Sequence, residues 1–286
     1  MIIISGSNSI LARSLVKRFK DEEIYSFDKD IRDIEFIKAV LSEKSPSVFI
    51  NCTEFHNPDE AEYKQDEAYD INGFAVGKIA NICKNINVYF VNISSSRVFG
   101  GEGNKPFSED DVARPESVYG DSKLLGEKLI AQSGCRYLIV RMTDIYGFER
   151  SPLLMAIDDI HNGISIDVCR ENYISHTYSP DAAGAVYNLV QNDGQGIFHF
   201  CQSGYSSTKE YYEWGLDKYY AERNSMLEFA INEIDLSGIP TVAEELKFNV
   251  LDTAKYSNFT GAAVRDWKAA LGDYITSYLL AKDNQY

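Results

Sequence analysis

The chain has 286 residues, of which 44% are hydrophobic and 25% are charged, and its formal net charge is −15. This length fits one large domain, or a core domain with a smaller partner. An acidic surface repels phosphate backbones, so nucleic acid is not expected as a partner. Nor is a membrane, because no apolar run approaches the roughly 20 residues of a spanning helix.

The cysteines and histidines give no sign of a metal centre. The five cysteines are scattered and odd in number, which predicts reduced, buried thiols in a cytoplasmic protein. No two of the four histidines have the spacing of metal ligands, so no metal is expected.

Short apolar runs alternate with helical patterns from the N-terminus to Tyr146. The patterns predict strands at 2–5, 24–27, 47–51, 88–93 and 137–141, and helices at 10–19, 33–41, 60–85 and 119–132. The first run is interpreted as a strand and not as a signal peptide, because it has only four apolar residues and no basic flank. Strands that alternate with helices pair in parallel, which predicts an α/β fold with a doubly wound, Rossmann-type sheet.

The alternation loosens in the second half of the chain. Ser179-Pro180-Asp181 resembles an N-cap followed by proline at the first helical position. A strand is predicted at 196–200, and Ser207 and Glu210 fit a capping box before an aromatic-rich helix. We therefore predict a nucleotide-binding core over 1–150, to which 179–202 returns, and a smaller, mostly substrate-binding part over 151–286.

The turn after the first strand, at 6–12, reads GSNSILA. A dinucleotide fold uses this turn to bring backbone amides and a helix N-terminus against a pyrophosphate. Gly6 is present, but Ser9 stands where a second glycine is usual, and its Cβ is expected to crowd the phosphates. Asp28 ends the second strand, where a carboxylate can bind ribose hydroxyls and favours NADH over NADPH, although Lys29 beside it weakens that preference. The turn alone also fits other α/β folds.

The stretch ESVYGDSK places Tyr119 and Lys123 one helical turn apart. The preceding strand ends in three serines, 94–96, and ligands of doubly wound sheets bind at such strand ends. Reduction of a ketone needs a proton at oxygen, which a tyrosine can supply while a serine hydroxyl holds that oxygen. A nearby ammonium favours tyrosinate, so Lys123 is expected to lower the pKa of Tyr119, and it can also bond a nicotinamide ribose.

Several stretches resemble extended short-chain dehydrogenases/reductases and, within them, the dTDP-4-dehydrorhamnose reductase family: FINCTEFHNPDEAE, ISSSRVF, PFSEDDVARPESVYGDSKLLGE and VRMTDIYG. The resemblance implies reduction of the 4-keto group of a nucleotide-diphospho-6-deoxyhexose by NADH or NADPH, in surface polysaccharide synthesis. It places Ser95 on the hydroxyl that polarises the carbonyl, Tyr119 on the general acid and Lys123 on its partner. It implies further cofactor contacts at Ile10, Leu11, Asp30, Ile31, Cys52 and Thr53.

The chain departs from this family in its charged residues. Glu54 stands where the family has a small apolar residue near the cofactor. Ser96 is expected on the substrate side. Arg97 beside it replaces an aromatic residue of the sugar pocket, and Asp144 replaces another. Glu245 stands about where arginine is usual. The altered turn and Glu54 are expected to affect cofactor affinity. Arg97, Asp144 and Glu245 are expected to affect which sugar is bound.

Other functions stay open. A dehydratase of the same superfamily wants Asp-Glu after the strand-end hydroxyl, where this chain has Ser96-Arg97. An epimerase usually has a longer C-terminal part. A non-catalytic NAD(P)-binding regulator is a further alternative, because the regulatory β subunit of methionine adenosyltransferase is similar to this family. The sequence leaves open the base, the sugar, the product stereochemistry and the oligomer, a homodimer among them.

Overall fold

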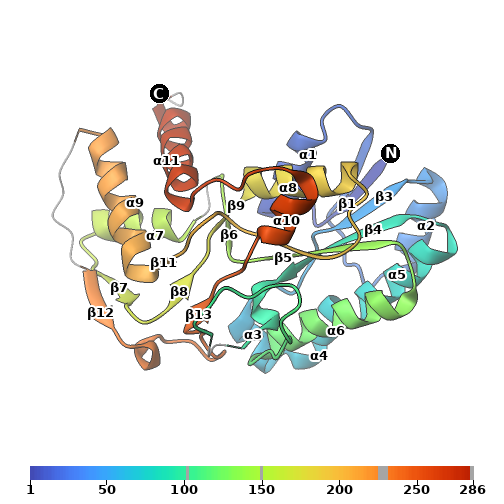
Figure 1. The fold of residues 1–286 in the computed structure, drawn as a ribbon, viewed down its shortest axis with the longest axis horizontal. Coiled ribbons are helices and arrows are strands. Elements are labelled where there is room, and N and C mark those ends of the chain that lie inside the picture. Colours follow the sequence, from blue (N-terminus) through green and yellow to red (C-terminus); the bar gives the residue numbers. More distant parts are fainter. Residues whose placement is uncertain (101–102, 149–150, 225–230, 284–286) are drawn as a thin grey trace.

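A six-stranded parallel sheet forms the centre of the molecule (Figure 1). The computed structural model describes residues 1–100, 103–148, 151–224 and 231–283. The strand order is β10-β5-β4-β3-β1-β2. The bounds are β1 Ile2–Ser5, β2 Ile24–Phe27, β3 Val48–Asn51, β4 Tyr89–Ser95, β5 Tyr137–Met142 and β10 Gly196–Phe200. The order reverses between β1 and β3, as in a doubly wound fold, so the predicted fold class is confirmed.

Helices cover both faces of this sheet. The helices before β5 are α1 Ile10–Arg18, α2 Ile34–Lys44, α3 Pro58–Tyr63, α4 Gln65–Tyr69, α5 Val76–Asn85 and α6 Val118–Ser133, with a π-helical segment η1 at Asp70–Ala75 and a 3₁₀ turn η2 at Ser96–Val98. The later ones are α7 Pro152–His161, α8 Ser179–Gln191, α9 Thr208–Glu222, α10 Ala254–Thr260 and α11 Trp267–Asp283, with a 3₁₀ turn η3 at Leu236–Gly238.

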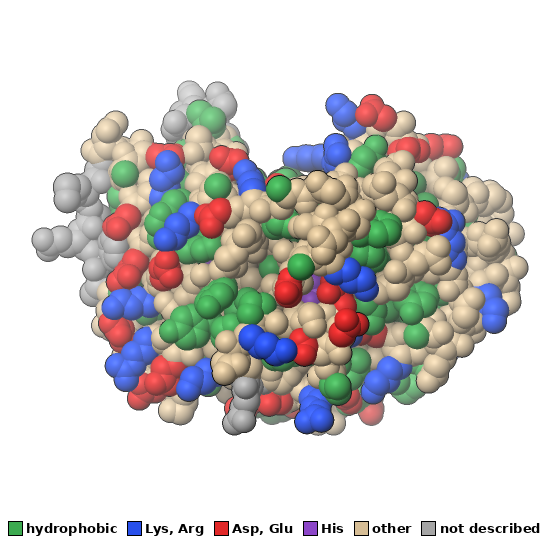
Figure 2. Space-filling view, in the orientation of Figure 1, with side chains coloured by type: hydrophobic (Ala, Val, Ile, Leu, Met, Phe, Trp, Pro, Cys, Tyr) green, Lys and Arg blue, Asp and Glu red, His purple; other side chains and the backbone are tan. Residues whose placement is uncertain are grey.

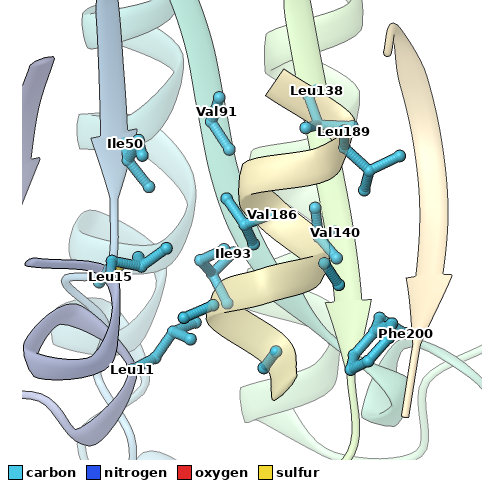
Figure 3. Packing of buried hydrophobic residues seen from close by; sticks show 14 of the residues in the cluster. Leu11, Leu15, Ile50, Val91, Ile93, Leu138, Val140, Val186, Leu189 and Phe200 are labelled. Carbon is cyan, nitrogen blue, oxygen red and sulfur yellow. The ribbon is translucent and has the colours of Figure 1, made fainter. Parts of the chain in front are cut away.

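Alternate residues of each strand point to opposite faces, so the sheet has two cores. On one face Ile4 of β1 packs in a cluster with Leu15 of α1 and Val186 of α8. Figure 3 shows Leu15 and Val186 packed together with the side chains of the neighbouring strands in this cluster. On the other face Ile3 packs in a cluster with Phe49, which includes side chains of α2, α5 and α6. Burial on both faces explains why these strands read as continuous apolar runs.

The second half of the chain builds a separate layer and also contributes to the sheet. Side chains of α7, α9 and α11 form their own buried cluster, on the left of Figure 1. Short strands accompany it: β6 Ile145–Tyr146 with β9 Thr177–Tyr178, β7 Ile166–Cys169 with β12 Ile231–Ile234, and β8 Tyr173–Ile174 with β11 Ser206–Ser207 and β13 Phe248–Asn249. Meanwhile α8 packs against α1, and β10 pairs with β5. The division at residue 150 stays a prediction, and residue 150 lies outside the described residues.

Two helical predictions need correction. The single helix predicted at 60–85 is four segments, broken at Lys64, whose backbone leaves the helical region, and widened into a π-helix at η1. Ser179 is not the N-cap of α8, because Tyr178 occupies that position and the Ser179 hydroxyl accepts a hydrogen bond from Ser14. Ser207 is the N-cap of α9, since Ser207 Oγ accepts from the Glu210 amide, while the Glu210 side chain pairs with Lys268. All five cysteines are buried, as predicted.

Candidate active site

The carboxyl end of β4 and the first turn of α6 bring the three predicted catalytic residues together. Ser95 is the last residue of β4, and Ser117 caps α6 by accepting a hydrogen bond from the Gly120 amide at 3.1 Å. A Cβ on Gly120 would lie 2.0 Å from the Arg97 carbonyl oxygen, so only glycine allows α6 to approach the turn after β4 this closely. The Ser95 hydroxyl bonds the Tyr119 phenol, and Lys123 follows one turn later on α6.

A carboxylate joins this group. One oxygen of Glu54, in the loop after β3, accepts from the Tyr119 hydroxyl at 3.1 Å and from Lys123 Nζ at 2.8 Å. Lys123 also donates to the Ile93 carbonyl at 2.8 Å. The side chain of Lys123 is 4% exposed and that of Glu54 is 33% exposed, so the ion pair reaches from the interior to solvent.

The expectation that Lys123 would lower the pKa of Tyr119 is wrong for this structure. Burial raises the pKa of the phenol well above its ordinary value, and the charge of Glu54 raises it further. The hydrogen bond from Ser95 and the charge of Arg97 act in the opposite direction. The ammonium that was expected to favour tyrosinate is paired with Glu54 instead.

A second, fully buried network lies on the same helix. Glu127, one turn after Lys123, binds Arg141 of β5 through both oxygens, with the shortest contact at 2.6 Å, and accepts from Ser94 Oγ at 2.6 Å. The side chains of the ion pair are 4% and 3% exposed. Arg141 also lies against His199, whose pKa falls to about 3, mainly through burial, so that its ring is neutral. This network ties the end of β4 to α6 and β5.

The turn between β1 and α1 has the features of a dinucleotide cradle. Gly6 has a φ of +68°, and a Cβ there would lie 2.8 Å from the backbone of Cys52. Ser9 Oγ accepts from the Ala12 amide at 3.2 Å, so this side chain caps α1. Thr53 Oγ1 is buried and has no hydrogen-bond partner among the residues that the structure describes. The helix N-terminus and the orphaned hydroxyl beside the Gly6 turn fit a phosphate-bearing cofactor.

The model of the family described as "RmlD substrate binding domain" matches residues 1–280. The chain belongs to this family.

Individual members of the family resemble the chain along nearly its whole length. The spore coat polysaccharide biosynthesis protein SpsK of Bacillus subtilis is 27% identical, over 96% of each chain. The dTDP-4-dehydrorhamnose reductase of Aggregatibacter actinomycetemcomitans is 26% identical, over 94% of this chain and 96% of the relative. The crystal structure of a dTDP-4-dehydrorhamnose reductase from Clostridium acetobutylicum superposes with a TM-score of 0.89 at 26% identity, over 98% of this chain and 99% of that one. The predicted resemblance is therefore confirmed.

The remaining residues that the family resemblance assigns to the cofactor differ in what they can offer. The side chains of Leu11, Ile31 and Cys52 lie in the hydrophobic cores, so only their backbone atoms are available to a ligand. Ile10 is half-buried at the start of α1. Asp30 is exposed and receives a hydrogen bond from Arg32 Nε at 2.9 Å, which lowers the pKa of the carboxyl.

Asp28 lies across the turn, where its carboxylate accepts a hydrogen bond from the Asn8 side chain. This contact holds Asp28 beside the β1–α1 turn, at the edge of the cradle formed by Gly6 and Thr53. Its predicted role in ribose binding stays a prediction.

On the predicted sugar side, two of the residues in which this member departs from the family pair with each other. Arg97 Nη2 lies 3.1 Å from a carboxylate oxygen of Glu245, and both side chains are largely buried. The charge of Asp144, which is exposed, also acts on Arg97. A cavity of about 680 Å³ beside this pair is lined by Arg170, Asp235, Thr241, Val242, Glu244 and Glu245. Arg97, one of the two aromatic replacements, is thus paired with Glu245, which stands where arginine is usual, and Asp144, the other aromatic replacement, is a neighbouring acid.

Sequence reasoning missed the contacts of Glu54, the Arg97–Glu245 pair and the Glu127–Arg141 network. A charged residue inside the apolar strand YLIVRM signals a buried partner, and Glu127 is spaced one turn from Lys123. Within the described part of the chain, no three residues form a cluster suited to a metal ion. In that part no helix is both long and apolar enough to cross a membrane.

Proposed function

We propose that this protein reduces the 4-keto group of a nucleotide-diphospho-4-keto-6-deoxyhexose with NADH or NADPH. The observation that carries the proposal is the meeting of Ser95, Tyr119 and Lys123 at the carboxyl end of β4, beside the β1–α1 turn. Its similarity to dTDP-4-dehydrorhamnose reductases supports the same class of substrate, and dTDP-4-dehydrorhamnose is the specific compound we would test first. Its similarity to SpsK supports a role in surface polysaccharide synthesis, for which we propose a cytoplasmic location.

Each residue of the site has a distinct part in this reaction. When bound, the reduced nicotinamide supplies the hydride that reaches the carbonyl carbon. The Ser95 hydroxyl donates a hydrogen bond to the carbonyl oxygen, and Tyr119 transfers its phenolic proton to the same oxygen. The ammonium of Lys123 lies on the same side of the site as the phenol, and it can donate hydrogen bonds to ribose hydroxyls. The remaining tyrosinate recovers a proton from solvent.

The residues of the cradle would hold the cofactor. The N-terminus of α1 and the close approach of Gly6 to β3 suit a pyrophosphate. Thr53 supplies an unpaired hydroxyl, and Asp28 suits ribose hydroxyls. On the side of the site opposite the cofactor cradle, Ser96, Arg97 and Asp144 are proposed to face the sugar.

The test is oxidation of NADH and NADPH with a panel of dTDP-, GDP-, CDP- and UDP-linked 4-keto sugars, followed by mass spectrometry of the product. We expect turnover with at least one of these sugars. A regulator without catalysis is the second candidate, and the altered glycine turn favours it. If calorimetry shows that the wild type binds neither cofactor, and Glu54→Ala and Ser9→Gly do not restore binding, the reductase proposal falls and the regulator takes its place.

A further inference from the structure

Glu54 contacts the proposed acid and its lysine partner with the same oxygen atom. It reaches them from the loop after β3, whereas Tyr119 and Lys123 both belong to α6. The family resemblance predicts a small apolar residue in its place, so these contacts are expected to be particular to this chain. Resting on the reductase function proposed above, we propose that Glu54 keeps Tyr119 protonated and so commits the site to reducing a carbonyl over oxidising the corresponding alcohol.

The first argument is the hydrogen bond itself. A carboxylate 3.1 Å from the phenol oxygen accepts a hydrogen bond from the phenolic O–H, which stabilises the neutral form. If the proton leaves, two negative charges face each other at that distance in a site where Tyr119 is only 7% exposed. Glu54 also occupies Lys123, whose ammonium would otherwise stabilise the phenolate.

The second argument is the balance of the other groups around the phenol. Ser95 of β4 donates a hydrogen bond to Tyr119, and Arg97 of η2 presents a positive charge, so both favour tyrosinate. Glu245 pairs with Arg97, and Glu62 of α3 accepts from the Val118 amide at the start of α6.

Glu54 is therefore the group whose removal shifts the balance toward the phenolate. Without its carboxylate, the hydrogen bond from Ser95 and the charge of Arg97 both favour the phenolate, and the ammonium of Lys123 loses its counter-ion. Burial still opposes ionisation.

The consequence follows from the proton balance of the two directions. In reduction, the carbonyl carbon gains a hydride, the carbonyl oxygen gains the phenolic proton of Tyr119, and tyrosinate then takes one proton from solvent. In oxidation, tyrosinate must be present at the start, to take the hydroxyl proton of the alcohol as hydride leaves its carbon for the oxidised nicotinamide. A group that disfavours tyrosinate therefore supports the first direction and suppresses the second.

The experiment measures the ionisation of Tyr119 directly. Protein labelled with carbon-13 at the phenolic ring carbon of its 19 tyrosines is titrated by NMR, and the signal that disappears in Tyr119→Phe is assigned to Tyr119. The full-length wild type and Glu54→Gln are compared, with Glu60→Gln as the matched control. Glu60 is an exposed acid on α3 that pairs with Lys64, so its variant removes the same charge without touching Tyr119.

We expect the Tyr119 signal to titrate at a pH lower by about one unit or more in Glu54→Gln, and unchanged in Glu60→Gln. An unchanged or higher titration in Glu54→Gln overturns the inference. Glu54→Ala is the second variant if the glutamine rebuilds the hydrogen bond. Because this titration needs neither substrate nor cofactor, it is independent of whether the reductase function holds. If it does hold, the ratio of kcat for alcohol oxidation to kcat for carbonyl reduction, measured near neutral pH with saturating substrates, should rise at least about tenfold in Glu54→Gln, and an unchanged ratio would also overturn the inference.

Discussion

Helix α6 contributes to two ion pairs, through residues four apart, that differ in the exposure of their carboxylates and in the other groups those carboxylates bind. Glu127 is paired with Arg141 and Ser94 in the interior, where neither charged side chain exceeds 4% exposure. Lys123 is equally buried, but its partner Glu54 is one-third exposed and shares its oxygen with Tyr119. The Glu127–Arg141 pair lies beneath the end of β4, and the Glu54–Lys123 pair lies at the open edge, where that strand end faces solvent.

The difference shows how one helix serves both structure and chemistry. A buried charge pair with all its hydrogen bonds made holds three elements in one arrangement, and losing one partner is costly. A pair that reaches solvent can exchange a partner for a ligand, because water or a ribose hydroxyl can replace the carboxylate. Position relative to the strand end, and not residue type, therefore separates the two roles. The hollow in the upper outline of Figure 2, between the side that carries α11 and the side that carries α1, shows the molecule opening between its two halves.

The largest effect is expected at the open edge. Tyr119→Phe removes one oxygen, so the fold and cofactor binding should persist while kcat falls about 10²–10⁴-fold, the usual worth of general acid catalysis. Steady-state kinetics with the active sugar, together with circular dichroism, checks this. Unchanged turnover under conditions where chemistry limits the rate would remove Tyr119 from its proposed role.

Replacing each of the two carboxylates by its amide, in Glu127→Gln and in Glu54→Gln, tests the comparison of the two ion pairs. Glu127→Gln leaves Arg141 without its counter-charge in the interior and should lower the free energy of unfolding by about 3–5 kcal/mol. Glu54→Gln should cost about 1 kcal/mol or less, since water reaches its side of the pair. Urea denaturation of the cofactor-free protein measures both. Equal losses in the two variants would contradict the division into a structural and a functional pair.

Neighbouring serines at the end of β4 offer a finer test. Ser95→Ala should lower turnover about tenfold, less than Tyr119→Phe, because an adjacent hydroxyl can substitute. Ser94→Ala should instead lower stability by about 1–3 kcal/mol, because it removes a buried donor to Glu127. Kinetics and denaturation are measured for both. A neutral Ser95→Ala beside an inactive Ser96→Ala would show that the catalytic position is one residue later.

The last predictions concern cofactor affinity. A carboxylate at roughly 8 Å from a pyrophosphate charge costs about 2 kcal/mol at an effective dielectric of 20, so Glu54→Ala should tighten binding about thirtyfold. Ser9→Gly should tighten it less, because it also removes the cap of α1. Asp28→Ala should shift preference toward NADPH. Calorimetric titration with both cofactors decides these points, and weaker binding by Glu54→Ala would show that this carboxylate contributes to the cofactor site.

Much of the fold follows from signals that act within a few residues. The strand at Gly196–Phe200 and the N-cap Ser207 of α9 were predicted to the residue, because side-chain periodicity and caps depend on local spacing. The division of the predicted helix at 60–85 into four segments was not predicted, since no proline or glycine marks Lys64, and η1 takes its form where it packs against α6.

For the site, the sequence by itself determined the residue types and their places on strand ends and helix starts. It placed Ser95, Tyr119 and Lys123 at one edge, and it marked Glu54, Arg97 and Glu245 as unusual. Only the tertiary structure decided which charges meet, because Glu54 and Lys123 are 69 residues apart and Arg97 and Glu245 are 148 apart. Pairing at such separations depends on strand order and on how closely α6 packs, and both arise from the whole core and not from any local pattern.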